Sequence, residues 1–187
     1  MSKQKIKEAA LNQFYKSGYE GVRMTQIAEE AGIRKQTLSY HYPSKKDLFM
    51  EIYKEVVKEE IKFTQSYFEG LYNRPSKEII WEFLKTFKLR AHDKPNTGFL
   101  QVVSFSTPLE LESYVSSNYL SYMNILRTEI KKIFEKETFN VNSEEATVYF
   151  LVLFDGLIVQ LLYNTKQSFD YSLEISFKMF WASIIKR

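Results

Sequence analysis

The stretch AEEAGIRKQTLSYHYPSKKDLF, from Ala28 to Phe49, decides the fold predicted for this chain. At its centre a small residue, Ala31, is followed by Gly32, which can adopt a positive φ, and by Ile33, which can fill the space between two helices. This pattern predicts the turn of a helix-turn-helix unit. One short helix is expected at about 24–31 and another at about 35–42.

The second helix of this unit has few apolar residues. Leu38 and Tyr42 are its apolar anchors and Pro43 ends it, whereas a helix kept only for packing shows a wider apolar stripe. In a helix-turn-helix unit this helix enters the major groove of DNA. We therefore expect it to present polar side chains to base edges and phosphates, namely Gln36, Thr37, Ser39 and Tyr40.

Longer helices are predicted on both sides of the unit. Apolar residues recur every four positions from Ile6 to Phe14, and Gly18 is expected to end that helix as a C-cap residue. After the unit, Ser44 is a good N-cap and Asp47 stands in the acid position of a capping box. A long amphipathic helix should therefore follow, to about residue 67.

Composition favours an all-α protein. The 187 residues are 44% hydrophobic and 26% charged, as in an ordinary globular protein, and include only six Gly and four Pro, so turns are scarce. The lack of Cys excludes a disulfide framework and any Cys-based metal site or nucleophile. The opening residues lack the apolar core of a secretory signal, and we expect a cytoplasmic protein.

One segment, residues 146–163, is nearly long and apolar enough to cross a bilayer. Asp155 at its middle would cost roughly 3 kcal/mol there, and the chain has no second candidate span. We therefore predict a helix buried among other helices and no membrane partner.

Charge is distributed unevenly along the chain. The first 49 residues carry nine Lys or Arg against five Asp or Glu, a net charge of +4, whereas the whole chain carries +3. A basic amino-terminal quarter on a near-neutral body indicates a polyanionic partner, although a merely solvated basic face would give the same pattern.

This basic quarter resembles the amino-terminal domain of the TetR family of transcription regulators. The resemblance covers about 45 residues and lies in Phe14, Gly18-Tyr19, Ile27-Ala28, Ala31-Gly32-Ile33, Thr37-Leu38, Tyr40-His41-Tyr42, Ser44-Lys45 and Leu48. It implies a helix-turn-helix DNA-binding domain at residues 1–46 and a helical effector-binding and dimerisation domain at 47–187, with about nine helices in all.

The resemblance also implies which side chains contact DNA. Residues at the start of the second helix, together with Thr25, would face the groove, and Tyr40, His41 and Lys45 would touch phosphates. Arg34 could instead be a plain surface charge, and His41 a structural hydrogen-bonding residue. The full set of predicted DNA-binding residues is Arg23, Thr25, Arg34, Lys35, Gln36, Thr37, Ser39, Tyr40, His41 and Lys45.

Two of these positions depart from the family pattern. Ser39 stands where the family most often has Tyr, and Arg23 stands where a Ser or Thr usually caps the first helix of the unit. An alternative function is therefore a helical ligand sensor or adaptor that no longer binds DNA.

The last two helices offer apolar stripes for a homodimer. Exposing both stripes would make a patch larger than soluble monomers tolerate, and the resemblance implies that these helices pair across a two-fold axis. Packing of both stripes inside one subunit is the alternative. The predicted interface consists of Val152, Gly156, Val159, Tyr163, Phe177, Phe180, Trp181 and Ile184.

Aromatic residues in the body have the material for an effector pocket, although aromatics at helical spacing more often form plain core. The predicted pocket residues are Phe63, Tyr67, Trp81, Phe87, Tyr119, Tyr122 and Phe150. Together with the resemblance they predict a repressor that a small hydrophobic or aromatic effector releases from a palindromic DNA operator.

Little in the sequence indicates an enzyme. The two His residues, His41 and His92, have no partners at metal-ligand spacing, and no phosphate loop or nucleophile elbow is present. Asp155 could act as an acid, but helix packing or an effector contact explains it equally well. We predict no catalytic residue, no metal and no cofactor.

Overall fold

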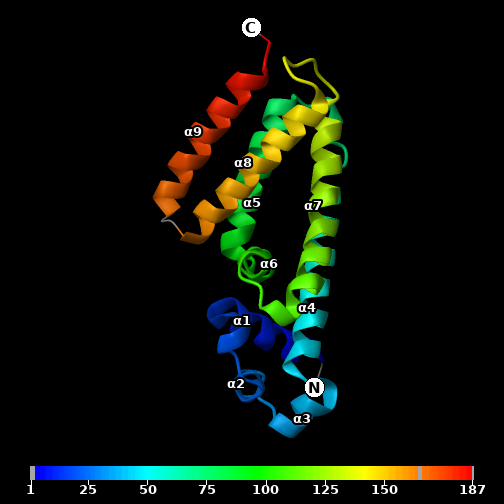
Figure 1. Ribbon diagram of the computed structural model, residues 1–187, viewed down its shortest axis with the longest axis vertical. Coiled ribbons are helices and arrows are strands. Elements are labelled where there is room, and N and C mark those ends of the chain that lie inside the picture. Colours follow the sequence, from blue (N-terminus) through cyan, green and yellow to red (C-terminus); the bar gives the residue numbers. More distant parts are fainter. Residues whose placement is uncertain (1–2, 164–165, 187) are drawn as a thin grey trace. The chain divides into compact units, whose positions relative to one another are not determined.

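The computed structural model describes residues 3–163 and 166–186, apart from the side chains of Phe105, Leu162 and Lys166. Within these residues the chain forms nine α-helices and no strand, which confirms the all-α prediction (Figure 1). The helices are α1 (Lys3–Gly21), α2 (Met24–Glu30), α3 (Lys35–His41), α4 (Lys45–Phe68), α5 (Ser76–Asp93), α6 (Pro95–Phe105), α7 (Glu112–Phe134), α8 (Ser143–Tyr163) and α9 (Lys166–Ile184). Two 3-10 turns, η1 (Leu71–Asn73) and η2 (Leu109–Leu111), precede α5 and α7.

Most helix boundaries lie at the residues that the sequence singles out. Gly18, predicted to end the first helix, instead kinks α1 with a φ of 66°, and the helix continues to Gly21. Ser44 caps α4, because its Oγ accepts a bond from the Asp47 amide at 3.1 Å and donates to the Asp47 carboxylate at 2.6 Å. The helix α6 starts at Pro95, whose fixed φ and missing N–H suit the first turn of a helix.

The chain packs into two compact units. The first consists of Met1–Glu60 and Arg90–Tyr122, and the second of Ile61–Leu89 and Met123–Arg187. Each of α4, α5 and α7 therefore contributes residues to both units. The division at residue 46 into a DNA-binding and an effector domain stays a prediction, because packing alone does not assign function.

In the first unit, α1, α2, α3 and the first turn of α4 form a small group of helices, here called the reading domain. Its aromatic core continues into α6: the Phe14 ring lies 5.2 Å from that of Phe49, which lies 5.8 Å from that of Phe99. Gly98 of α6 lies directly against Tyr15 of α1, since a Cβ at Gly98 would be 2.7 Å from the Tyr15 hydroxyl. The side chain of Tyr15 thus packs directly against the backbone of α6 at Gly98.

The second unit has an aromatic core built from the end of α4 and from α5, α7, α8 and α9. The ring of Trp81 lies 4.9 Å from that of Phe177, and the ring of Phe87 lies 4.7 Å from that of Phe154. Helices α8 and α9 lie side by side (Figure 1). Trp181 of α9 is buried in this core.

The predicted α9 side of the dimer interface is wrong. Phe177, Phe180, Trp181 and Ile184 are all buried within their own unit, Phe180 with only 1% of its surface exposed. Large aromatic side chains gain most by burial, and here α9 buries them against α5, α7 and α8. The large apolar side chains that remain exposed on the described part of α9 are Tyr171, Ile175 and Met179.

The helix α8 has one buried and one exposed apolar face. Phe150, Phe154 and Ile158 are fully buried, whereas the predicted interface positions Val152, Gly156, Val159 and Tyr163 are exposed. Asp155 lies on the exposed side between two of these valines, and partial burial raises the pKa of its carboxyl. No helix in the described part of the chain is long and apolar enough to span a membrane.

Candidate nucleic-acid interface

The turn between α2 and α3 has the geometry that the sequence predicts. Gly32 has a φ of 67°, its amide donates to Glu29 O at 3.0 Å, and the Ile33 amide donates to Ala28 O at 2.9 Å. These two bonds form a Schellman motif, in which a glycine in the left-handed region ends the helix. The motif fixes the direction in which the chain leaves α2 and enters α3.

The helix α3 is held by two side chains and exposes most of the others. Leu38 is fully buried and Tyr42, the residue after the helix, is 2% exposed. The predicted groove-facing residues Lys35, Gln36 and Thr37 are all exposed. Ser39 is also exposed and Tyr40 is 86% exposed, an unusual position for an aromatic ring without a partner molecule.

The remaining predicted DNA contacts lie around α3. Arg23, Thr25 and Arg34 are exposed, and His41 is partly buried with its ring 5.4 Å from that of Tyr40. Arg23 precedes α2 without a side-chain cap, but its amide donates to Gln26 Oε1 at 2.7 Å, so Gln26 takes over part of the missing cap. The helix therefore starts normally despite the departure from the family pattern, and Arg23 remains available at the surface.

Lys45 has a structural role that sequence reasoning missed. Its ammonium donates to Tyr19 O at 2.8 Å and to Val22 O at 3.2 Å, and it lies 4.2 Å from the centroid of the Tyr19 ring. It thereby joins the start of α4 to the link between α1 and α2. The phosphate contact predicted for Lys45 stays a prediction.

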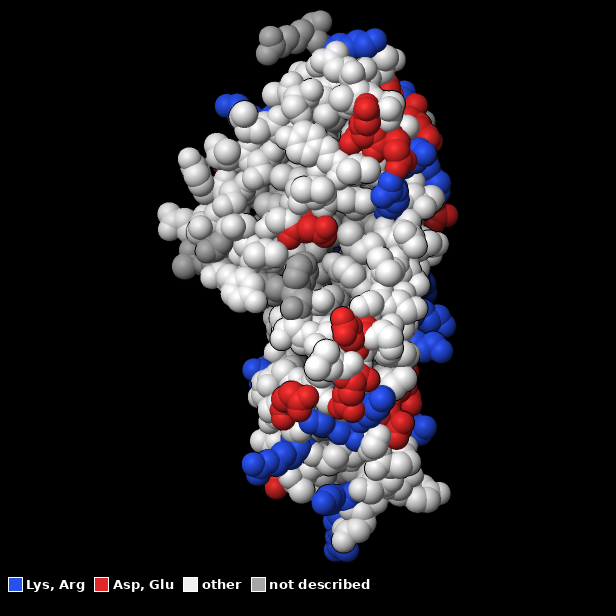
Figure 2. All heavy atoms as spheres, viewed as in Figure 1, with Lys and Arg blue, Asp and Glu red and all other residues white. Residues whose placement is uncertain are grey.

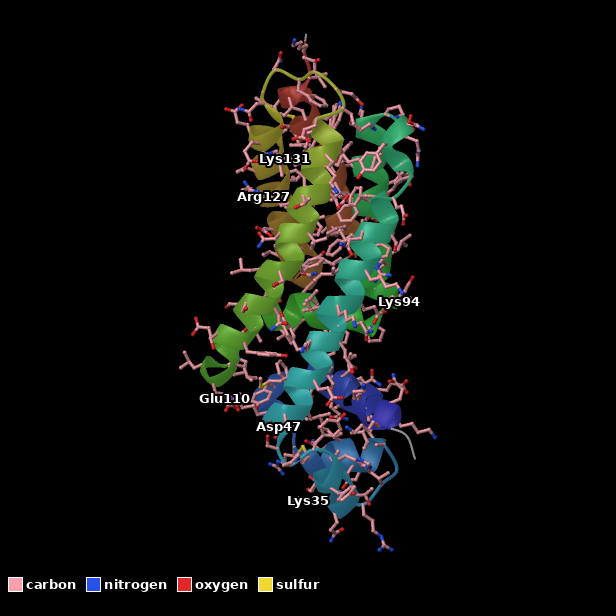
Figure 3. The ribbon with its side chains drawn as sticks, turned by 90° about the vertical axis from the view of Figure 1, so that its right-hand side faces the viewer. Lys35, Asp47, Lys94, Glu110, Arg127 and Lys131 are labelled. Atoms are coloured by element: carbon pink, nitrogen blue, oxygen red, sulfur yellow. The ribbon has the colours of Figure 1, made fainter. Side chains whose placement is uncertain are left out.

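Basic side chains project from the end of the reading domain formed by α2 and α3 (Figure 2). Lys35 lies at this end, on the helix expected to enter the groove (Figure 3). An exposed, positively charged, short helix on a fixed turn is suited to bind a polyanion.

The predicted effector-pocket residues fall into two groups. Tyr119 and Tyr122 belong to the first unit, with ring centroids 5.9 Å apart. Phe63, Tyr67, Trp81, Phe87 and Phe150 belong to the second unit, where Phe87 and Phe150 are buried in its core. Trp81 lines a surface groove of about 350 Å³ together with Lys77, Glu78, Glu174 and Phe177. The assignment of the seven residues to an effector pocket stays a prediction.

Buried polar side chains on α4 and α6 were not predicted. The carboxylate of Glu60 is 3% exposed and accepts bonds from Arg90 at 2.5 Å and from Thr97 at 2.8 Å, and burial raises the pKa of this carboxyl. Gln101, one turn after Thr97, is 1% exposed, and neither polar atom of its side chain has a hydrogen-bond partner among the described residues. The signal was the spacing of Thr97, Gln101 and Ser104 within an otherwise apolar helix.

The model of bacterial regulatory proteins of the tetR family matches residues 6–52, which include most of α1, all of α2 and α3, and the turn between them. Residues 6–52 are therefore similar to the amino-terminal domain of the tetR family. The reading domain of this chain is 40% identical over 55 residues to the HTH-type transcriptional regulator RutR of Escherichia coli. That match covers 29% of this chain and only 26% of the length of RutR.

Weaker similarity to another HTH-type regulator extends along the chain. The regulator IcaR of Staphylococcus aureus, named as a negative regulator of the biofilm operon icaADBC, is 23% identical over 166 residues, which cover 88% of this chain and 86% of IcaR.

Solved structures share the fold of the whole chain. A transcriptional regulator from Saccharomonospora viridis in complex with choline has a TM-score of 0.76 at 20% identity, with 98% of this chain and 97% of that one covered. The regulator FadR of Bacillus subtilis in complex with stearoyl-CoA has a TM-score of 0.72 at 18% identity, with 96% and 97% covered.

Proposed function

We propose that this protein is a cytoplasmic transcription regulator, not an enzyme, that binds a palindromic DNA operator through α3. The observation that carries the proposal is the exposure of Lys35, Gln36 and Thr37 on a short helix that Leu38 and Tyr42 hold against the reading domain. Because α3 has so few packing residues, we infer that its function is to present these exposed side chains to a partner. In the major groove, such polar side chains distinguish base pairs by their hydrogen-bonding edges.

The proposed regulator acts as a homodimer through the exposed faces of α8 and α9. Val152 is 65% exposed, Tyr163 78% and Met179 63%, a large apolar exposure for a subunit that stays alone in solution. Gly156 has open space where a Cβ would lie and lines a groove of about 250 Å³ with α9 residues Ser172 and Ser176. This groove would admit side chains of a second subunit.

We further propose that the protein is a repressor released by a small effector. The name of IcaR describes a negative regulator, and the FadR and S. viridis structures contain stearoyl-CoA and choline. In this chain the Gln101 amide is buried and lacks a hydrogen-bond partner among the described residues, so a ligand could satisfy it, in addition to the predicted aromatic side chains.

The proposal is tested by selecting bound duplexes from a random DNA pool with the purified protein. We expect a palindromic winner whose affinity falls steeply with salt. Gln36→Ala and Lys35→Ala should each change sequence preference and weaken binding by about 1–3 kcal/mol, whereas the control Lys178→Ala, an exposed cation on α9, should do neither. A folded dimer that enriches no duplex would exclude DNA binding and favour a ligand sensor or adaptor.

A further inference from the structure

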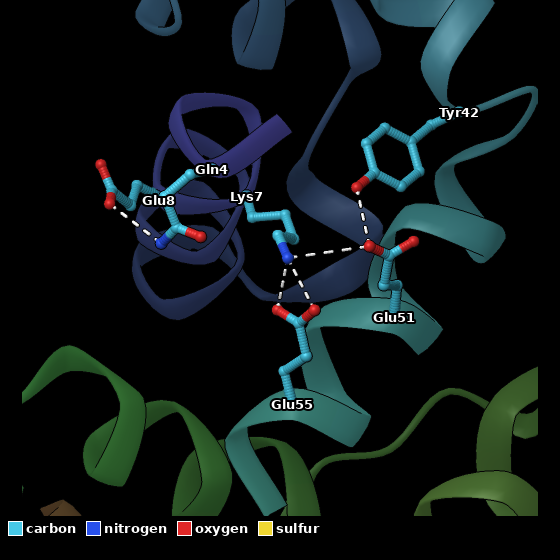
Figure 4. Close-up of polar contacts among 6 residues, drawn as sticks. All are labelled: Gln4, Lys7, Glu8, Tyr42, Glu51 and Glu55. Atoms are coloured by element: carbon cyan, nitrogen blue, oxygen red, sulfur yellow. Dashed lines mark hydrogen bonds and ion pairs between the residues drawn. The ribbon is translucent and has the colours of Figure 1, made fainter. Parts of the chain in front are cut away.

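A chain of polar contacts joins α1, the end of α3 and α4 (Figure 4). Tyr42, which directly follows α3, donates its hydroxyl to Glu51 Oε1 of α4 at 3.1 Å. Lys7 of α1 lies 3.7 Å from the same oxygen and donates to both carboxylate oxygens of Glu55 at 2.6 and 2.7 Å. Lys7 thus contacts both Glu51 and Glu55 of α4, and Glu51 in turn accepts the bond from Tyr42, the residue after α3.

These contacts are partly shielded from water. Tyr42 is 2% exposed, and the Lys7 side chain is 16% exposed. Burial, followed by the hydrogen bond to Glu51, raises the pKa of Tyr42, so its hydroxyl keeps the proton that it donates. Lys3 lies one turn before Lys7 on the same side of α1 and places its ammonium 5.6 Å from the centroid of the Tyr42 ring.

The orientation of α3 depends strongly on Tyr42. With seven residues, α3 is too short to be stable as an isolated helix, so its packing sets its direction. Leu38 anchors the middle of the helix and Tyr42 anchors its end. A shift of the Tyr42 ring would therefore tilt the exposed residues about Leu38.

We infer that Lys7 and Glu51 are positioning residues that set the angle at which α3 meets DNA. The inference rests on the proposed DNA-binding function. Lys7 does this without touching DNA, because its ammonium is directed at Glu51 and Glu55. The competing explanation is that Lys7 is simply one of the basic residues that bind phosphate.

The decisive variant is Glu51→Ala, because the two explanations predict opposite signs. Removing a negative charge near the reading domain should tighten DNA binding if only charge matters. If Glu51 positions Tyr42, the affinity of the folded protein should instead fall by about three- to tenfold on every duplex. The matched control is Glu29→Ala, which removes the same charge from an exposed position on α2 outside this chain of contacts.

Three further variants separate positioning from charge and from loss of stability. Tyr42→Phe keeps shape and charge but loses the bond to Glu51, so it should weaken binding in the same way. Lys7→Met should weaken binding without changing the slope of affinity against salt, and Lys7→Arg should restore it. All affinities are measured at salt concentrations where denaturation curves show each variant to be fully folded.

Each result decides the matter. Weaker binding by Glu51→Ala and Tyr42→Phe, with an unchanged salt slope for Lys7→Met, supports the positioning role. Tighter or unchanged binding by Glu51→Ala, or a slope for Lys7→Met reduced by about one phosphate contact, overturns it. If the unaltered protein binds no selected duplex, the proposed function fails and the inference with it, which distinguishes that failure from a failure of the positioning role alone.

Discussion

A single methyl group at position 98 tests the contact between α6 and the reading domain. In Gly98→Ala the new Cβ would lie 2.7 Å from Oη and 2.8 Å from Cζ of Tyr15, well inside van der Waals contact. Overpacking of this kind costs about 1–3 kcal/mol, and the ring of Tyr15, which is 38% exposed, can relieve part of it by moving outward. Alanine in place of glycine inside a helix contributes about 1 kcal/mol of stability. We expect a net loss of about 1 kcal/mol.

Removing the ring should reverse the sign of this effect. In a Tyr15→Ala background the methyl group meets no ring, so Gly98→Ala should stabilise the protein by about 1 kcal/mol. The coupling energy between the two positions is then about 2 kcal/mol. Urea denaturation of the four proteins, followed by circular dichroism, measures it. Equal effects of Gly98→Ala in both backgrounds would refute the direct contact of α6 with α1.

Four further predictions follow from individual side chains. Lys45→Ala should lower the free energy of unfolding by about 1–3 kcal/mol in urea denaturation, because it removes two bonds to backbone carbonyls, and it should also flatten the salt dependence of DNA binding. Val152→Lys should convert a dimer into a monomer in sedimentation velocity, since it places charge in the proposed apolar interface. Gln101→Leu should raise the unfolding free energy by about 1 kcal/mol, because it replaces a buried amide that lacks partners among the described residues; a clear loss of stability would show that the amide is paired. The pKa of Glu60 is raised from its ordinary 4.5 in the folded protein, so its contribution to stability is fully present below that value and is lost as the pH rises through the raised pKa; Glu60→Gln should flatten this part of the stability curve against pH.

The sequence predicts well those features that are set by a few neighbouring residues. Gly18 and Gly32 adopt the positive φ that suits helix ends, and the Ser44 hydroxyl caps α4 by accepting a bond from the Asp47 amide and donating one to the Asp47 carboxylate. Both effects are local, because a missing Cβ or a short polar side chain acts on the adjoining backbone whatever the rest of the fold does.

Features that depend on tertiary packing were harder to predict. The helix α9 is apolar on more than one side, and its sequence does not show which side the subunit itself buries; the larger aromatics Phe177, Phe180 and Trp181 turned inward. The bonds of Lys45 to Tyr19 and Val22, and those of Lys7 to α4, join residues more than 20 positions apart. Charge patterns reveal such lysines as basic residues but not the direction in which their ammonium groups point.

Both tryptophans of the chain, Trp81 and Trp181, lie in the second unit. Tryptophan fluorescence therefore monitors the unfolding of that unit, while the helix-turn-helix contributes only tyrosine signals and helical circular dichroism. If the two units unfold at different denaturant concentrations, the fluorescence and circular dichroism transitions will not coincide, and a single midpoint will describe neither unit. The positions of the two tryptophans therefore allow the unaltered protein to report whether its two units unfold together.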